Sequence, residues 1–190
     1  MTSSAMIWLR RATMADADTI VELIDISSQG GIAEDYRRVY GAGTNWKQQA
    51  RYDVLRRGSE LGFELAVLAM IGKKVAGGMV LNPLLPDANL LNDQDERIKP
   101  LGRLMLRVAG SLLIREIAVF PASRGQGVAR SMIGLAREHA KATTLKCVSL
   151  TVNASNLPAL ALYETEGFKE VDRVEHLGGT LILMAAQVES

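Results

Sequence analysis

The stretch RGQGVARS, residues 124–131, decides the fold because it joins an apolar run to a helical pattern. LLIREIAVF precedes it and MIGLAREHA follows it, so the local order is strand, glycine-rich turn and helix. The first amides of a helix have no acceptor within the helix and point beyond its end. Gly125 and Gly127 would let a phosphate approach those amides, and Arg124 could add a charge-assisted hydrogen bond. The stretch therefore predicts a phosphate or pyrophosphate site.

Two common phosphate-binding motifs do not fit these residues. A P-loop that starts at Gly125 needs glycine at position 130 and lysine at 131, where Arg130 and Ser131 stand. A dinucleotide-binding fingerprint also needs a glycine or alanine at 130, and an acidic residue about 20 residues further on. The segment SLTVN occupies that place. The simple alternative, that the glycines only make a tight turn, stays open on this stretch alone.

Composition indicates one globular domain over residues 1–190 in a reducing compartment. The chain has 190 residues, 48% of them hydrophobic, and a net charge of +1. Such a balanced charge gives no field that would attract nucleic acid or an anionic membrane, so neither is expected as a partner. The single cysteine, Cys147, and two histidines give no disulfide framework and no metal site. The start of the chain lacks the order of a signal peptide, and we expect a cytoplasmic protein.

The rest of the chain alternates strand and helix patterns. A Thr13–Asp16 capping box should begin a helix after an opening strand, and Gly77 and Gly78 suggest a bulge in a later hairpin. The polar segment from Asn82 to Pro100 is expected to be a loop insertion. The predicted strands are residues 6–12, 63–70, 74–81, 111–120, 147–154, 168–176 and 178–188. The predicted helices are residues 15–27, 32–43, 45–59 and 103–110, and one after each of the strands 111–120 and 147–154.

A second motif lies in NASNLPALALYETEGF, residues 153–168. Asn156 or Ser155 can cap a helix there, Pro158 fits its first turn, and Gly167 can end it. Together with the pattern of Arg124, Gly127 and Ala129, this segment resembles the GNAT superfamily of N-acyltransferases. The residues of the second signature are Asn156, Ala159, Leu162, Tyr163, Gly167 and Phe168. The resemblance extends over most of residues 7–188.

The resemblance implies a mixed α/β fold, an α+β arrangement whose central, mostly antiparallel sheet is flanked by helices and splayed between strands 4 and 5. It also implies that acetyl-CoA is the acyl donor. The pantetheine arm would pair with the backbone of Ile117, Ala118 and Val119, and Asn156 would border the groove. The pyrophosphate would be bound by Arg124, Gly125, Gln126, Gly127, Val128, Ala129 and Arg130.

Two side chains are candidates for proton transfer. Glu116 stands in an apolar strand where several members of the family carry a glutamate base, and the alternative is an ion pair with Arg115 or another cation. Tyr163 lies two helical turns after Asn156 and could protonate the leaving thiolate. Its alternative role is packing against Leu160 and Phe168. These alternatives stay open at the level of sequence.

The sequence thus predicts an acetyl-CoA-dependent N-acetyltransferase that transfers acetyl directly to a primary amine. The sequence shows no general base partner for Cys147 that would recommend an acyl-cysteine intermediate. The partner is a small-molecule acceptor, favoured over a peptide because no face carries concentrated charge, and a homodimer is left open. The alternative function is a CoA-binding regulatory domain of the same fold that performs no transfer.

Overall fold

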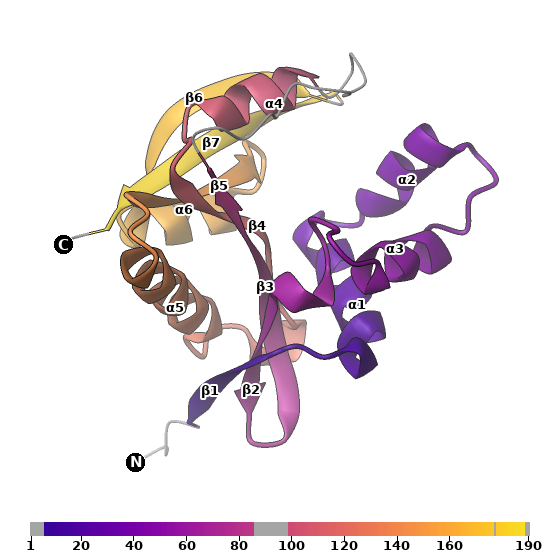
Figure 1. The fold of residues 1–190 in the computed structure, drawn as a ribbon, viewed down its shortest axis with the longest axis horizontal. Coiled ribbons are helices and arrows are strands. Elements are labelled where there is room, and N and C mark those ends of the chain that lie inside the picture. Colours follow the sequence, from indigo (N-terminus) through magenta and orange to yellow (C-terminus); the bar gives the residue numbers. More distant parts are fainter. Residues whose placement is uncertain (1–5, 86–98, 177, 189–190) are drawn as a thin grey trace. The chain divides into compact units, whose positions relative to one another are not determined.

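The computed structural model describes residues 6–85, 99–176 and 178–188. They form two compact units that interleave along the chain. Unit 1 comprises Met1–Leu81 and Arg115–Gly134, and unit 2 comprises Asn82–Ile114 and Leu135–Ser190. Backbone hydrogen bonds link the strands in the order β1-β2-β3-β4-β5-β7-β6 (Figure 1). The expectation of a single domain over residues 1–190 stays a prediction.

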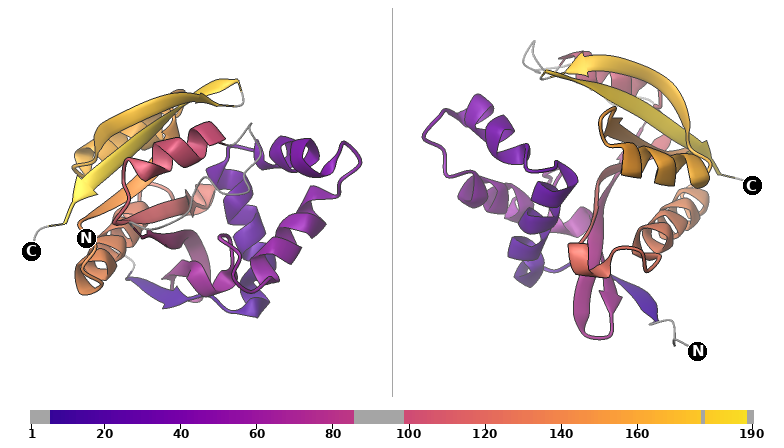
Figure 2. Two further views of the ribbon diagram at one scale, coloured as in Figure 1. Left: turned by 45° about the horizontal axis from the view of Figure 1, so that its top comes forward. Right: turned by 180° about the vertical axis from the view of Figure 1, so that it is seen from behind.

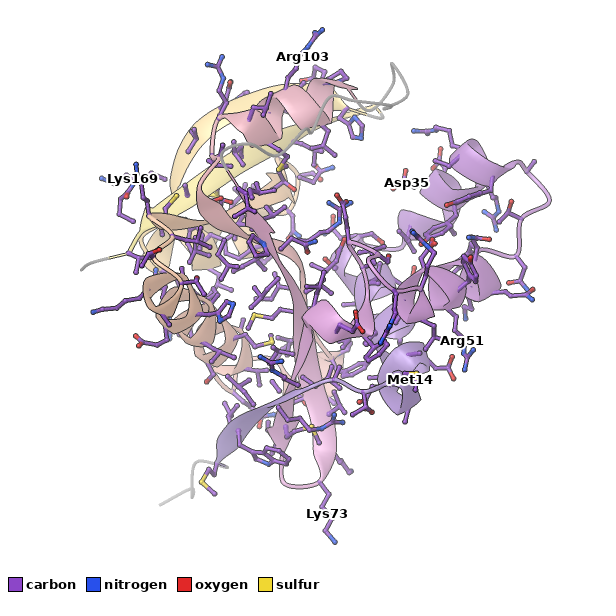
Figure 3. The ribbon with its side chains drawn as sticks, viewed as in Figure 1. Met14, Asp35, Arg51, Lys73, Arg103 and Lys169 are labelled. Atoms are coloured by element: carbon purple, nitrogen blue, oxygen red, sulfur yellow. The ribbon has the colours of Figure 1, made fainter. Side chains whose placement is uncertain are left out.

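Unit 1 begins with a strand and a group of helices. The capping box is confirmed: the amide of Thr13 donates to Oδ2 of Asp16 at 2.8 Å, and the box opens a short 3-10 turn that leads into α1. Helices α2 and α3 lie side by side, and Arg51 of α3 pairs with Asp18 of α1 at 2.8 Å (Figures 1 and 3). The elements are β1 (Ile7–Arg11), η1 (Met14–Asp16), α1 (Ala17–Ser27), α2 (Ile32–Tyr40) and α3 (Trp46–Leu55).

A hairpin of β2 (Ala66–Ile71) and β3 (Lys74–Leu84) follows the 3-10 turn η2 (Phe63–Leu65). Gly72, at φ +58°, and Lys73 make the turn, and Lys73 projects from its tip (Figure 3). The predicted bulge is confirmed, because Ala69 pairs with Gly77 whereas Met70 pairs with Val75. The strand was predicted to begin at Phe63, but it begins at Ala66, after the turn η2.

Two glycines of β3 allow close packing within unit 1. A Cβ on Gly77 would lie 2.6 Å from the carbonyl oxygen of Ala118 in β4, so only glycine permits this approach of the two backbones. A Cβ on Gly78 would lie 2.8 Å from a methyl carbon of Leu23 and 2.8 Å from one of Leu68. Helix α1 therefore packs directly on the sheet, and the apolar core of unit 1 fills the space between them.

Unit 2 holds most of the remaining sheet. Strand β4 pairs in parallel with β5 from Ser111 opposite Cys147 to Ile114 opposite Leu150, and among the described residues their register ends there. Strand β7 pairs antiparallel with both β5 and β6, and α4 packs against β6 (Figure 2). Strand β4 and helix α5 are each divided between the two units, and η3 belongs to unit 1. The remaining elements of the chain are α4 (Lys99–Leu106), β4 (Ser111–Val119), η3 (Pro121–Ser123), α5 (Val128–Ala142), β5 (Cys147–Asn153), α6 (Leu157–Thr165), β6 (Lys169–His176) and β7 (Gly179–Gln187).

The seven strands form the mixed, mostly antiparallel sheet that the sequence predicts, with helices beside it. The boundaries of the predicted loop insertion from Asn82 to Pro100 are wrong at both ends. Residues 82–84 continue β3 and residues 99–100 begin α4, while residues 86–98 lie outside the described residues. The helix predicted over residues 103–110 starts earlier, at Lys99. No described helix has the length and apolar character needed to cross a membrane.

Candidate functional site

The turn between β4 and α5 carries the predicted phosphate site. Nε of Arg124 donates to the carbonyl oxygen of Val119 at 3.3 Å, which ties the turn to the end of the strand. Nε2 of Gln126 donates to the carbonyl oxygen of Ala122 at 3.2 Å. Helix α5 then begins at Val128, and the amide of Ser131 makes its first bond, to the carbonyl oxygen of Gly127 at 3.0 Å.

The glycines of this turn have backbone conformations that other residues rarely adopt. Gly125 has φ +73° and Gly127 has φ +83°, and a Cβ on either glycine would meet nothing within 4 Å. Among the described residues, the backbone amides from Gly125 to Ala129 donate to no acceptor. The turn therefore presents unpaired donors beside open space at the N-terminus of a helix of 15 residues. Such an arrangement can bind an anion.

Strand β4 leads into this turn and carries Glu116. Its neighbour Arg115 pairs with Glu60, with Nη1 and Oε2 2.9 Å apart, so that guanidinium has another carboxylate as its partner. Ala118 is buried in the core of unit 1, and Ile117 and Val119 are partly exposed. Through the bond from Arg124 to Val119, unit 1 brings the predicted residues of β4 and the turn together.

The carboxyl of Glu116 borders a small apolar pocket under α1. Glu116 is the one titratable residue among those that line it. Burial raises the pKa of Glu116, and the nearby charge of Asp35 on α2 raises it further. The hydroxyl of Ser27 and the charge of Arg115 act in the opposite direction. A carboxylate whose pKa is raised is a stronger base than an ordinary glutamate.

Unit 1 also holds a buried polar pair that the sequence did not predict. Tyr36 of α2 and Asp53 of α3 are both buried, and the tyrosine hydroxyl donates to Oδ2 of Asp53 at 2.9 Å. Burial and this bond raise the pKa of Tyr36. The ring of Tyr36 also stacks on that of Tyr40, with centroids 5.7 Å apart, whereas Tyr52 is exposed. An aspartate at a position where the helical pattern predicts burial is the signal that could have revealed the pair.

Asn156 and Tyr163 belong to unit 2. Asn156 caps α6, as predicted: its Oδ1 accepts from the amide of Ala159 at 3.3 Å, and Pro158 lies in the first turn. Gly167, at φ +77°, follows the end of the helix, which is also as predicted. Tyr163 is 7% exposed, and its ring lies tilted against that of Phe168 with centroids 5.8 Å apart. The packing foreseen for Tyr163 against Phe168 is therefore present, while its role in proton transfer stays a prediction.

Other reactive side chains are not arranged for catalysis in the parts of the chain that the structure describes. Cys147 is partly buried, and burial raises the pKa of its thiol, which lowers the fraction of reactive thiolate. His139 is exposed on α5. No group of three or more potential metal ligands gathers among the described residues.

The family of the chain follows from a comparison with known proteins. Residues 32–168 match the acetyltransferase (GNAT) family. The chain belongs to the GNAT family. It is therefore an acyltransferase, as the two sequence motifs predict. A search of curated protein sequences finds no significant match to this GNAT protein.

Solved structures of acetyltransferases share the GNAT fold. An N-acetyltransferase from Staphylococcus aureus Mu50 is 19% identical, with a TM-score of 0.69 over 94% of this chain and 100% of that chain. The ribosomal-protein-S18-alanine N-acetyltransferase from Escherichia coli is 16% identical, with a TM-score of 0.63 over 97% and 96%. The PaiA N-acetyltransferase from Thermoplasma acidophilum, in complex with coenzyme A, is 16% identical, with a TM-score of 0.61 over 96% and 99%. At these identities the likeness shows the fold alone.

Proposed function

We propose that this GNAT protein transfers acetyl from acetyl-CoA directly to a primary amine of a small molecule or an amino-acid derivative. The observation that carries the proposal is the turn between β4 and α5, where the amides have no acceptor among the residues that the structure describes and open space lies beside Gly125 and Gly127. In a GNAT protein this turn is the expected place of the pyrophosphate of the acyl donor. A tight turn alone would not require that the amides stay unpaired.

The residues of the turn fit an anionic donor. The amides from Gly125 to Ala129 would hold the pyrophosphate, and Arg124 and Arg130 would add positive charge. Side chains in place of the two glycines would enter the open space that a phosphate needs. In this proposal the pantetheine amides pair with the backbone of Ile117, Ala118 and Val119, beyond the end of the pairing of β4 with β5.

The proposed chemistry is a direct nucleophilic displacement. An amine with a pKa near 10 is about 99.9% protonated at neutral pH, so it must lose a proton before it attacks. Glu116 accepts that proton, directly or through a water molecule. The amine nitrogen then forms a bond to the thioester carbon and loses a further proton to solvent, and the carbon–sulfur bond breaks. Tyr163 donates its phenolic proton to the departing thiolate and is reprotonated from solvent. Backbone amides near Ile117 and Val119 would stabilise the negative oxygen, which is typically worth about 3 kcal/mol.

The proposal also covers the size of the acceptor, the partners of the protein and its location in the cell. A small acceptor is favoured because the charges of the chain nearly cancel, at a net +1. Nucleic acid and membrane are not expected as partners, a homodimer is left open, and no metal is expected to take part. The single cysteine supports a location in the cytoplasm.

A screen of amines with acetyl-CoA tests the proposal. Release of free CoA thiol is followed for each amine, and acetylation of the consumed amine is confirmed by mass spectrometry. We expect thiol release that depends on the amine and saturates with its concentration. Tight binding of acetyl-CoA without turnover on any amine of a broad panel would contradict the proposal and favour the regulatory domain.

A further inference from the structure

Helix α6 ends in a Schellman motif that includes Tyr163. The amide of Phe168 donates to the carbonyl oxygen of Tyr163 at 2.9 Å. The amide of Gly167, which has φ +77°, donates to the carbonyl oxygen of Glu164 at 3.0 Å. Such a motif often adds an apolar contact between the two residues that its longer bond joins. Here that contact is the packing of the Tyr163 ring against the ring of Phe168.

Arg137 of α5 contacts this helix end at three points. Its Nη2 donates to the backbone carbonyl oxygen of Glu166, and its Nη1 lies 3.5 Å from Oε2 of the same residue. Its guanidinium carbon lies over the Phe168 ring, 5.8 Å from the ring centroid. All these residues belong to unit 2, as does Tyr163. One side chain therefore holds both the backbone that ends α6 and the ring against which Tyr163 packs.

The three contacts use properties that arginine has and lysine lacks. The last carbonyl oxygens of a helix have no partner within the helix, and a basic side chain is one of the groups that can satisfy them. The planar guanidinium can donate to a carbonyl and a carboxylate at the same time, and it is attracted to the face of an aromatic ring. The side chains of Arg137 and Glu166 are 31% and 16% exposed, so solvent screens this pair less than a fully exposed one.

We propose that Arg137 is a positioning residue for Tyr163, and that it fixes the phenol ring through Glu166 and Phe168. This inference rests on the proposed role of Tyr163 as the general acid. A general acid must lie within hydrogen-bonding distance of the atom that it protonates, and a displacement of about 1 Å can lower a rate about 100-fold. The ring that supports the acid must therefore itself be held in place.

A double-mutant cycle between Arg137 and Tyr163 tests the inference. Arg137→Met keeps an unbranched side chain but removes the guanidinium, and we expect kcat to fall about 10-fold with an unchanged KM for acetyl-CoA. In the Tyr163→Phe background, which has no phenolic proton to donate, the same change should lower kcat less than about twofold. A side chain that only stabilises the fold would have the same effect on kcat in both backgrounds.

Fluorine NMR adds a readout that needs no acceptor amine. The chain has four tyrosines, so labelling with 3-fluorotyrosine gives few resonances, and the one missing from Tyr163→Phe belongs to Tyr163. We expect Arg137→Met to shift or broaden this resonance and to leave the others in place. Lys141→Met, which removes an exposed cation one turn further along α5, is the matched control and should change neither the resonances nor kcat.

Arg137→Lys covers the case in which Arg137→Met does not fold. Lysine keeps the charge beside Glu166 but cannot make all three contacts. We expect a loss of kcat of about threefold, again confined to the background that contains Tyr163, and a smaller change in the Tyr163 resonance.

The outcomes separate this inference from the proposed function. An unchanged Tyr163 resonance in both Arg137 variants, or equal losses of kcat in the two backgrounds, would overturn the role of Arg137. Full turnover in Tyr163→Phe, together with a shifted resonance in Arg137→Met, would support the contact but contradict its purpose in positioning an acid. In that case the proposed role of Tyr163 fails, while acetyl transfer established by the amine screen stands.

Discussion

Among the strand–turn–helix segments in the described part of the chain, those of α5 and α6 have helix starts that are built in opposite ways. At the start of α6, Oδ1 of Asn156 accepts from the amide of Ala159, and Oδ1 of Asn153 accepts from the amide of Ser155 at 2.9 Å. At the start of α5, the amides from Gly125 to Ala129 have no acceptor within the described residues. Side chains accept hydrogen bonds from the amides at the start of α6, whereas the amides at the start of α5 have no such acceptor among the described residues.

The difference shows how the same local structure can serve stability in one place and ligand binding in another. A helix start that is capped by a side chain gains about 1 kcal/mol, and an uncapped start forgoes that gain. Glycines at positive φ add a further cost, because they lose more conformational freedom on folding than other residues. Proteins tolerate such losses of stability where ligand binding compensates for them, which is the basis of the proposal for α5.

The largest expected effect is at the open helix start. Gly127→Glu should abolish acetyl-CoA binding, because the new carboxylate would occupy the phosphate site and repel the phosphate. Isothermal titration calorimetry on the folded variant measures the change in affinity. Gly72→Glu, at a positive-φ glycine in the β2–β3 turn that is equally open, is the matched control and should bind normally. An unchanged affinity of Gly127→Glu for acetyl-CoA would contradict the proposal that the start of α5 binds the phosphate while that of α6 does not.

The next largest effect is expected at Glu116, the proposed base in β4. Burial raises the pKa of Glu116, and the carboxyl accepts a proton only when it is charged, so kcat/KM should rise with pH through that raised pKa. Glu116→Gln should lose this limb and about 10²- to 10⁴-fold in kcat/KM, with normal acetyl-CoA affinity. Glu60→Gln, which removes the partner of Arg115, should keep the limb. A pH profile that survives in Glu116→Gln would assign the base elsewhere.

A smaller loss of turnover is expected when Tyr163, the proposed general acid on α6, is changed. Tyr163→Phe removes the proton but keeps the ring that packs on Phe168. A thiol of pKa about 8.5 leaves partly unprotonated, so we expect a loss of turnover of about 100-fold, at the lower end for general acids. Tyr52→Phe, at an exposed tyrosine of α3, should change nothing. A lower melting temperature with normal turnover would instead show that Tyr163 only packs.

The smallest effect tests the cap itself. Asn156→Ala should lower the free energy of unfolding by about 1 kcal/mol, and Asn156→Asp should restore most of it, because aspartate caps equally well. Chemical denaturation measures both. If Asn156→Asp restores stability but weakens acetyl-CoA binding, the side-chain amide contributes to the donor site as well as to the helix. If binding is unchanged, the role of Asn156 is confined to the cap.

Much of the fold could be predicted because its determinants are local. The capping box at Thr13, the bulge near Gly77 and the cap at Asn156 each depend on a few neighbouring residues, and all three are present. The predicted loop at Asn82 failed because asparagine and proline disfavour strands in general, yet β3 continues through Pro83, which is exposed.

The environment of the candidate base could not be predicted, because it depends on contacts between distant parts of the sequence. Glu116 stood out as an acid in an apolar strand, but Ser27 and Asp35 come from helices early in the chain. The pairing of Tyr36 with Asp53 likewise joins two helices whose packing no local pattern specifies. The structure pairs Arg115 with Glu60, while the role of Glu116 as the base stays a prediction.

The interleaving of the two units affects how the chain can fold during its synthesis. The first 81 residues leave the ribosome without Ala118 and Phe120, which belong to the core of unit 1 or pack against it. That core can close only after the intervening segment of unit 2 has been made, and closing so long a loop costs entropy. Nascent chains stalled before residue 115 should therefore remain sensitive to protease. For the same reason, no single cut divides the chain into two fragments that each contain a whole unit.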